Sequence, residues 1–355
     1  MRMRNLLIFT LATRSIFACT GLFTGSPCTA TVGTSSRNYT TPALCIAAMP
    51  ASLVSDGNSY VCSLYNDSQF TAGFTLSGLT TDATHVITIT AAAGQSFQDN
   101  AGVRTNALAY NQANGVGFLT AVSYGDVVQI TSVNYVTISR LQFKNTATPG
   151  RVISSTGTHS TVANNIVDCA GPGGLYGAFD GVVGVIYNNS IILRGSGASG
   201  QIGINIGYAA STVEGNTIVC PSDLTCTTST GINGVGSYAY TVRSNAIFGF
   251  TTAIGSTGAY TATNNATNLS SMTGSSNQVS VTWSSATPFT GAATASLNLI
   301  AVAATSLAAT GYLDASYPND ISGHSRANPP TIGAWELASS AGPSAIRHSV
   351  KGGEK

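Results

Sequence analysis

Charged residues are scarce in this chain of 355 residues, where Lys, Arg, Asp and Glu together make up 8% of the sequence and the net charge is +1. The basic residues are scattered, and the densest group, Arg140, Lys144 and Arg151, is more typical of a solvated face than of a phosphate site. The sequence therefore lacks the basic patch that marks a nucleic-acid-binding protein, and no nucleic-acid partner is expected. A content of 43% hydrophobic residues nevertheless argues against a disordered chain.

A long hydrophobic run is missing from the N-terminus. The apolar stretch Leu6–Ala12 is much too short to span a bilayer, so no membrane span is expected. Arg2 and Arg4 before this stretch, and Cys19 after it, partly resemble an export signal with a lipoprotein processing site. Arg14 interrupts that pattern, and a retained N-terminal arm that docks on another protein is the second interpretation.

Cysteine occurs in an odd number, seven, which argues against a complete disulfide framework. Cys220 and Cys226 bracket a short loop between repeats and could pair in an oxidising environment. Zinc-like spacing is missing, because no close CxxC pair occurs and the four histidines do not fall near the cysteines. We therefore expect neither a metal site nor a cofactor.

Long runs of helix-forming residues are absent too, and short β-branched stretches bounded by Gly, Asn and Ser take their place, which predicts an all-β protein. Five times between residues 162 and 265, an aliphatic or small residue is followed by two polar or small residues and then an asparagine. Successive asparagines of this pattern are 24, 27, 29 and 20 residues apart, about one turn of a β-solenoid per repeat. The five are Asn165, Asn189, Asn216, Asn245 and Asn265.

In a solenoid a coil cannot bury its apolar side alone, so equivalent residues stack about 4.8 Å apart in successive coils. The residue that opens each repeat should form one inward column, and the residue two positions after each asparagine a second, broken only at Thr267. The asparagines should form a ladder whose side-chain amides bond to each other and to the turn backbone. Unrelated Asn-containing loops are the rival interpretation, but loops alone do not explain the flanking apolar columns.

The chain divides into five segments by composition. We predict an N-terminal arm or export signal over residues 1–31 and an entry region with the first coils over 32–126. Regular coils should follow over 127–275, an irregular C-terminal cap over 276–337 and a loose tail over 338–355.

The entry region contains one helix candidate. Thr41 suits the N-cap, Pro42 suits the first helical position, and the apolar segment Leu44–Met49 ends at Pro50. Such a helix would cover the open first coil, whose exposed strand edges otherwise invite aggregation.

The segment Asp320–Glu336, DISGHSRANPPTIGAWE, resembles the closing motif of right-handed parallel β-helix proteins of the pectate-lyase-like superfamily. The entry segments Val32–Leu53, Leu64–Gly78 and Thr81–Phe97 resemble those of β-helix proteins encoded by tailed bacteriophages. Together with the coils, the resemblance covers residues 32–337 and implies a right-handed parallel β-helix. It says less about function, because related solenoids serve as lyases, glycosidases, adhesins and virion parts. The closing motif is matched by Asp320, Gly323, Arg326, Gly333, Ala334, Trp335 and Glu336.

His324 lies between Asp320 and Arg326, a set of residues that could suggest acid–base chemistry. The resemblance implies a structural role instead. Asp320 and Arg326 would tie down the closing turn, which ends at Glu336, and Trp335 would plug the final coil.

A glycosidase on this fold would need two carboxylates that face each other across a groove. Asp168 and Asp180 are the best pair, because the glycine-rich loop between them could bring them together. The alternative interpretation is two loop carboxylates that cap turns or face solvent. Acids are too sparse for a calcium-assisted lyase, and the Asp-Asp and Gly-His-Gly signatures of polygalacturonases do not occur in the sequence.

Glu214 and Arg243 hold equivalent positions in adjacent repeats and should stack as a surface ion pair, worth about 0–1 kcal/mol. Tyr187 falls in the same outward row. It could contact a sugar, although a single exposed tyrosine on a strand is usually inert.

We predict a non-enzymatic structural or surface-binding protein of a tailed-phage virion, located on the particle as capsid decoration or as part of a tail spike or fibre. The N-terminal arm would dock it on other virion proteins, and analogy with related spikes implies a homotrimer. Cell-surface polysaccharide is the expected ligand if the protein binds one. Two alternatives stay open, a polysaccharide depolymerase that uses Asp168 and Asp180, and an exported bacterial adhesin or lipoprotein that is secreted or held at the cell surface.

Overall fold

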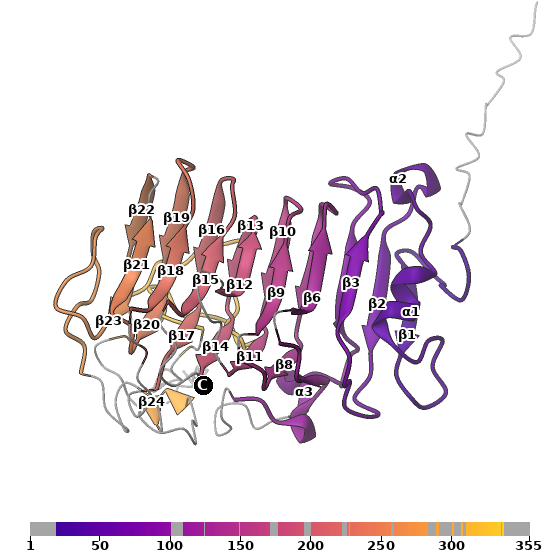
Figure 1. Ribbon diagram of the computed structural model, residues 1–355, viewed down its shortest axis with the longest axis horizontal. Helices are drawn as coiled ribbons and strands as arrows, with labels where there is room; N and C mark the ends of the chain where they lie inside the picture. The colour runs from indigo at the N-terminus through magenta and orange to yellow at the C-terminus, as the bar shows by residue number, and fades with distance from the viewer. Residues whose placement is uncertain are drawn as a thin grey trace, which may run out of the picture.

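The computed structural model is a β-solenoid in which one chain winds three parallel sheets around a common core (Figure 1). It describes residues 19–100, 109–123, 125–148, 150–170, 177–194, 200–221, 226, 228–256, 259–282, 289–290, 300–301, 307, 310–334 and 336. Each strand pairs in parallel with the equivalent strand of the next coil, and the coils are right-handed, as crossovers between parallel strands almost always are. The predicted fold class, an all-β parallel β-helix, is therefore confirmed.

We number the sheets in the order in which the chain visits them within a coil. Sheet 1 contains nine strands: β1 (Cys28–Val32), β2 (Tyr60–Leu64), β4 (Ile87–Ala91), β7 (Val136–Ser139), β10 (Ser160–Ala163), β13 (Gly184–Tyr187), β16 (Ser211–Glu214), β19 (Tyr240–Arg243) and β22 (Tyr260–Thr263). Sheet 2 contains seven: β5 (Gly117–Thr120), β8 (Gln142–Asn145), β11 (Ile166–Cys169), β14 (Ser190–Leu193), β17 (Thr217–Val219), β20 (Ala246–Phe248) and β23 (Ala266–Thr267). Sheet 3 also contains seven: β3 (Phe74–Ser77), β6 (Asp126–Thr131), β9 (Arg151–Ser155), β12 (Gly177–Val182), β15 (Ile202–Ile206), β18 (Thr230–Gly234) and β21 (Thr252–Ser256). A short antiparallel pair, β24 (Phe289–Thr290) and β25 (Ile300–Ala301), lies outside these sheets.

The core consists of inward columns of aliphatic side chains. Both columns predicted from the repeat are in register, and all their members are buried. Each buried Val or Ile stabilises the fold by about 1.5–3 kcal/mol relative to an exposed one. The sheet 1 column contains Val162, Ile186, Val213, Val242 and Ala262, and the sheet 2 column contains Val167, Ile191, Ile218, Ile247 and Thr267.

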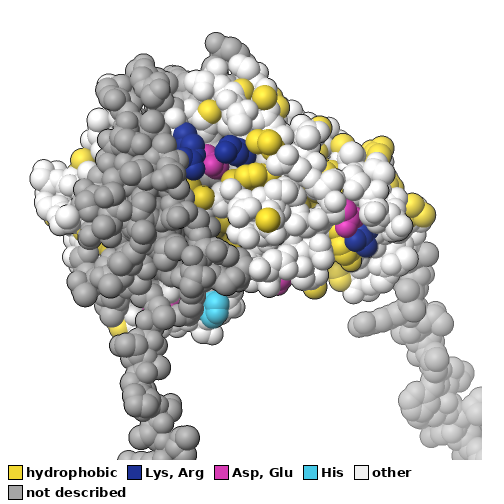
Figure 2. All heavy atoms as spheres, turned by 90° about the horizontal axis from the view of Figure 1, so that it is seen from below, with side chains coloured by type: hydrophobic (Ala, Val, Ile, Leu, Met, Phe, Trp, Pro, Cys, Tyr) yellow, Lys and Arg dark blue, Asp and Glu magenta, His cyan; other side chains and the backbone are white. Residues whose placement is uncertain are grey.

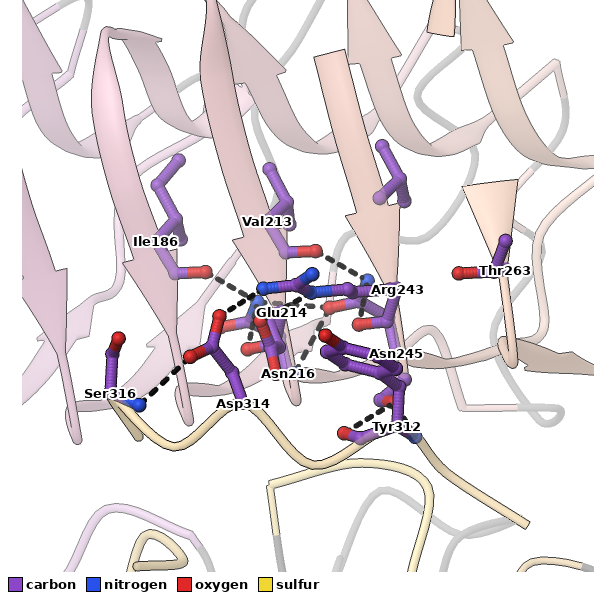
Figure 3. Close-up of polar contacts among 12 residues, drawn as sticks. Ile186, Val213, Glu214, Asn216, Arg243, Asn245, Thr263, Tyr312, Asp314 and Ser316 are labelled. Atoms are coloured by element: carbon purple, nitrogen blue, oxygen red, sulfur yellow. Dashed lines mark hydrogen bonds and ion pairs between the residues drawn. The ribbon is translucent and has the colours of Figure 1, made fainter. Parts of the chain in front are cut away.

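The five asparagines of the repeat form a continuous buried ladder at the corner between sheets 1 and 2. Figure 3 shows two of its rungs, Asn216 and Asn245. Each rung donates from Nδ2 to the Oδ1 of the next, over 2.9–3.1 Å. The same Oδ1 accepts the backbone N–H of the preceding rung, and each Nδ2 also donates to a backbone carbonyl one coil back. The ladder thus satisfies the polar groups of a bend that has no access to water.

The ladder runs one rung further than the repeat predicted. Asn265 donates from its backbone N–H and from Nδ2 to the Oδ1 of Asn277. These two asparagines are only 12 residues apart, because the last coil is short. The spacing therefore falls outside the period of the repeat, and the sequence pattern did not include Asn277. At the other end, Asn165 Oδ1 accepts from the backbone N–H of Leu141, which fills the equivalent position one coil earlier.

The residue before each rung makes the bend itself. These residues all have φ between 53° and 63°, the left-handed region that glycine and asparagine enter at least cost. At each bend, two consecutive residues therefore have different roles. The first turns the chain, and the second, the asparagine, stacks in the ladder. The bend residues are Asn164, Asn188, Gly215, Ser244 and Asn264.

The predicted N-terminal helix is confirmed as α1 (Pro42–Ala47), whose N-cap Thr41 accepts a hydrogen bond from Leu44 N. It packs against β1, β2 and β3, and β3 is the first strand of sheet 3. This is the position expected of a helix that covers an open sheet edge. Three further short helices lie in the entry region: α2 (Leu53–Asp56), α3 (Phe97–Asn100) and a 3₁₀ turn, Gln112–Asn114.

Three disulfides use six of the seven cysteines, so one cysteine stays outside the disulfides, as the odd count indicated, although the count gave no sign that three pairs would form. Cys220 pairs with Cys226, as predicted, and two further pairs join Cys19 to Cys28 and Cys45 to Cys62. The Cys45 pair joins α1 to β2, a proximity created by the winding of the first coils and not visible as a spacing. The seventh cysteine, Cys169, is buried, and its Sγ donates to Gly150 O.

The segment predicted as a C-terminal cap is irregular, and part of it lies along the side of the helix against sheet 2. Ala334 N donates to Thr217 Oγ1, and Gly333 N donates to Ser244 O. The reason is that several outward positions of sheet 2 are apolar and need a cover. Ile166, Ile192, Val219 and Phe248 pack there with Leu307, Ile321, Ile332 and Ala334.

A first prediction concerns the ladder. Asn216 accepts two hydrogen bonds from Asn189 and donates to Ile186 O and Asn245 Oδ1, all buried. Asn216→Ala should lower the free energy of unfolding by about 3 kcal/mol, because several buried groups lose their partners. Asn233→Ala, on the outward face of the same coil, should cost less than about 1 kcal/mol by urea denaturation. Equal losses for the two variants would contradict a structural role for the ladder.

A second prediction concerns the disulfides. Under denaturing, non-reducing conditions the intact mass should be lower than that of the reduced chain by two hydrogens per disulfide, for three disulfides. The double variant Cys45→Ser/Cys62→Ser should lose about 3 kcal/mol of stability, as expected for a loop of 17 residues. Cys169→Ser should leave the mass difference unchanged. Alkylation of all seven cysteines in unreduced protein from an oxidising compartment would refute the pairing.

Candidate binding groove

Sheet 3 presents one polar side chain per coil on its outward face. In register from β6 to β18, the row is Gln129, Ser154, Asp180, Asn205 and Asn233. None of them is buried, while the flanking inward residues, such as Ile153 and Phe179, are fully buried. The alternation follows from the two-residue period of a strand with one face on the core.

Two adjoining hollows follow this row along the helix. One of about 650 Å³ lies over β9, β12, β15 and β18, and one of about 580 Å³ lies between α1, β3, β6 and β9. They share Gln129 and Arg151, so they form one groove that runs across the strands and along the helix axis. The strands concerned lie side by side across the middle of Figure 1.

Arg151 lies in the groove between two carboxylates. Its Nη1 is 3.0 Å from Asp180 Oδ2, and its Nε and Nη2 are 2.5 Å and 3.2 Å from the two oxygens of Asp126. Asp126 Oδ2 also accepts from Ser154 Oγ, and Asp180 Oδ1 accepts from Asn205 Nδ2. Three of the four carboxylate oxygens in this network therefore accept hydrogen bonds, whereas Asp126 Oδ1 is buried, in ion-pair contact with Arg151 but without a hydrogen-bond donor.

Two exposed tyrosines stand beside the groove. Tyr208, which lines it, is 70% exposed and Tyr238 is 43% exposed. Both rings lie near Gly236, whose φ is +81°, because a Cβ placed on this glycine would lie 3.2 Å from Tyr238 and 3.8 Å from Tyr208. The turn below is anchored by the buried Tyr240, whose hydroxyl donates to Gly207 O and whose pKa is raised by burial.

This arrangement has the chemistry of a sugar-binding surface. Amide and hydroxyl side chains can both donate to and accept from sugar hydroxyls. The face of a tyrosine ring packs well against an apolar C–H surface, and its hydroxyl remains available to solvent or ligand. Exposed rings next to convergent polar groups in a hollow are typical of a ligand site.

The predicted catalytic pair is not brought together. Asp180 lies in the groove on β12 of sheet 3, whereas Asp168 lies on β11 of sheet 2 and is only 3% exposed. Asp168 has its own basic partners, Arg194 at 2.6 Å and Lys144 at 3.8 Å. The two carboxylates share no partner, because the chain turns a corner of the helix between them.

The structure pairs Asp180 with Asp126 and Arg151 instead, a grouping that the sequence analysis did not make. The spacing of these three residues could have indicated the grouping. Asp126 and Arg151 are 25 residues apart and Arg151 and Asp180 are 29 apart, spacings within the range found between rungs of the ladder. It is weaker than the asparagine signal, since strands β9 and β12 differ in length and β12 carries an irregularity after Asp180.

Glu214 and Arg243 stack in adjacent coils, as predicted, with Arg243 Nε 2.6 Å from Glu214 Oε2. They do not form a surface pair, because the segment 310–319, here called the strap, covers them (Figure 3). Asp314 of the strap also binds Arg243, whose guanidinium lies 4.3 Å from the ring of Tyr312. Burial raises the pKa of Glu214, which is only 5% exposed.

The strap also corrects the expectation for Tyr187. Its ring stacks on Tyr317 with centroids 4.2 Å apart, so it is not an exposed sugar platform. Asn188 Nδ2 next to it donates to Asn319 O, and Asn264 Nδ2 donates to Thr310 O near the other end of the strap. Part of the outward row of sheet 1 is therefore closed.

The residues of the closing motif hold the C-terminal segment together. Asp320 Oδ1 accepts from the backbone of Ser322 and His324, and its Oδ2 accepts from Glu336 N. Arg326 donates to Asn188 Oδ1 in the helix and to Gly333 O, and burial lowers its pKa. Trp335 lies outside the described residues.

Charged side chains gather at only a few places on the face seen from below in Figure 2, where uncharged polar and apolar surface predominates. In the ranges that the structure describes, no group of three or more His, Cys, Asp or Glu side chains is placed to hold a metal ion. Among the helices of those ranges, none has the length and apolar character needed to cross a membrane.

No family model matches the chain, and no curated protein matches it. A crystal structure of pectate lyase Pel9A is similar over 90% of this chain and 100% of that chain, with a TM-score of 0.43 and 14% sequence identity. A likeness at that level carries no argument about activity, so function has to be inferred from the residues of the groove.

A third prediction concerns the strap and pH. The backbone N–H of Ser316 and the nearby Arg243 lower the pKa of Asp314 below its usual 3.8. Asp314 therefore stabilises the fold above that value, and the contribution is lost as pH falls through the lowered pKa. Asp314→Asn should melt roughly 2 °C below wild type at neutral pH, and the difference should vanish in acid. A difference that is the same at about pH 7 and about pH 2.5 would contradict this.

Proposed function

We propose that this protein binds an extended glycan in the groove on sheet 3 and holds it without cleaving it. The observation that carries the proposal is that two exposed tyrosines, Tyr208 and Tyr238, lie near the same glycine beside the outward amides of the groove, Asn205 and Asn233. Elsewhere on the helix, the outward face of sheet 2 and part of that of sheet 1 are covered by the C-terminal segment. The sheet 3 groove is open to solvent and is lined by the polar row together with aliphatic residues such as Val183, Ile202 and Val235.

The groove suits a polymer better than a small molecule. Its polar row repeats once per coil, about every 4.8 Å along the helix axis. A sugar chain that lies along the axis would meet an equivalent side chain at each coil from Gln129 to Asn233. Affinity should therefore rise with chain length until the chain spans the row, because each coil adds contacts of the same kind.

Binding without cleavage follows from the state of the two carboxylates. A glycosidase needs one carboxyl group free to protonate the leaving oxygen and another free to attack or to activate water. Both oxygens of Asp180 accept hydrogen bonds, from Arg151 and Asn205, and Asp126 Oδ2 accepts from Arg151 and Ser154, while Asp126 Oδ1 is buried against Arg151 Nε. A depolymerase is the second candidate function, because Asp126 and Asp180 lie in one groove on either side of Arg151. Release of reducing ends that Asp180→Asn abolishes would establish it.

The disulfides favour a site of action outside the reducing cytosol. Cystine pairs persist in secreted, periplasmic and surface proteins and are rare in proteins assembled in the cytosol. This supports the exported alternative over the virion role predicted from the entry segments. Cys19 pairs with Cys28, and a sulfur in a disulfide cannot carry the lipid of a lipoprotein, so anchoring at Cys19 is disfavoured. The homotrimer and docking through residues 1–31 remain predictions.

The proposal is tested by a binding screen against immobilised polysaccharides, followed by calorimetry on the best ligand. Tyr208→Ala and Tyr238→Ala should each weaken binding about tenfold, because each removes one stacking ring. Both side chains are exposed, so the melting temperature should not change.

Tyr312→Ala is the matched control. Tyr312 is 46% exposed, close to the 43% of Tyr238, but it lies on the strap over sheet 1. Its loss should leave glycan affinity unchanged. If Tyr208→Ala and Tyr238→Ala bind as tightly as wild type, the groove is not the site.

A further inference from the structure

We infer that the groove selects glycans without acidic groups and rejects polyuronates. This inference rests on the proposed function and names the class of its ligand. The observation behind it is the balance and geometry of charge in the groove, where two carboxylates and one guanidinium are the only charged groups lining the two hollows in the described part of the chain.

The single cation is already paired with both aspartates of the groove. Arg151 uses Nη1 on Asp180 and both Nε and Nη2 on Asp126. An incoming carboxylate is best recognised by two parallel N–H donors of a guanidinium. Arg151 could offer such a pair only by giving up one of its aspartates, which would leave a partly buried carboxylate without its counter-charge.

The net charge of the groove is negative, because Asp126 and Asp180 together outweigh Arg151. A polyuronate carries one carboxylate per sugar, so a chain in the groove would place negative charges next to both aspartates. Like charges at short range in a hollow that is partly shielded from water repel more strongly than on an open surface.

The uncharged members of the row suit neutral sugars. Asn205 Nδ2 donates to Asp180, and Asn233 Nδ2 donates to Asn205, so the amides are oriented as a chain that ends at Asp180. Oriented amides and a serine hydroxyl can match hydroxyl and acetamido groups without any change in charge. Specificity then comes from an unfavourable contact with acidic chains as well as from favourable contacts with neutral ones.

The experiment compares oligosaccharides of equal length by calorimetry at low and high salt. The probes are a neutral glucan, an N-acetylglucosamine oligomer and an oligogalacturonate. Wild type should bind at least one of the first two and bind the oligogalacturonate at least tenfold more weakly, with the deficit reduced by salt. Asp180→Asn should reduce the ratio of the neutral to the acidic affinity about tenfold, with both affinities measured in the same variant.

Two further variants keep the test decisive. Asn233→Lys adds a positive charge to the row without disturbing Arg151, and should also strengthen binding of the oligogalacturonate. Asp82→Asn is the control, because Asp82 is an exposed aspartate in the turn before β4 and outside the groove, and it should leave all affinities unchanged.

The outcomes separate the two proposals. If wild type binds the oligogalacturonate as tightly as the neutral ligands, the inference on charge fails while glycan binding stands. If the gap exists but neither Asp180→Asn nor Asn233→Lys narrows it, the electrostatic cause is wrong. If no glycan in the screen binds, the proposed function fails and the inference fails with it.

Discussion

The stacking of each coil on an equivalent coil is the constraint on which the rest of this protein depends. Backbone hydrogen bonds between parallel strands set the spacing, and the buried asparagine ladder fixes the bend between sheets 1 and 2. A rung cannot shift by one residue without turning its apolar side chains to water and its ladder amide out of register. The interior therefore allows little variation, and the outward positions carry what is particular to this chain.

The outward faces of the three sheets differ in how far they are covered. The apolar part of the outward face of sheet 2 is covered by the C-terminal segment, which forms a second core with Ile192, Val219 and Phe248. Part of sheet 1 is closed by the strap, where Asp314 joins the pair of Glu214 and Arg243. Sheet 3 keeps its polar row beside two hollows. The site is thus defined as much by the covering of the other faces as by its own residues.

Much of the fold could be predicted because it repeats. The spacing of Asn165 and its equivalents predicted the solenoid, the inward columns and the ladder, and Thr41 and Pro42 predicted α1. Asn277 was missed because the last coil is shorter than the period. The grouping of Asp126, Arg151 and Asp180 was also missed. Asp168 was paired with Asp180 because a loop connects them, but a connecting loop does not show whether two residues lie on the same sheet of the helix.

The sequence by itself determined the architecture, since side chains that recur once per coil must stack and a period of 20 to 29 residues leaves few other ways to bury them. Only the tertiary structure decided which faces stay open. The path of a non-repeating segment such as 310–336 depends on single contacts, including Arg326 with Asn188 and Ala334 with Thr217, that join residues more than 100 positions apart. Such contacts leave no periodic trace, because each occurs once and is specified by shape and burial on both partners.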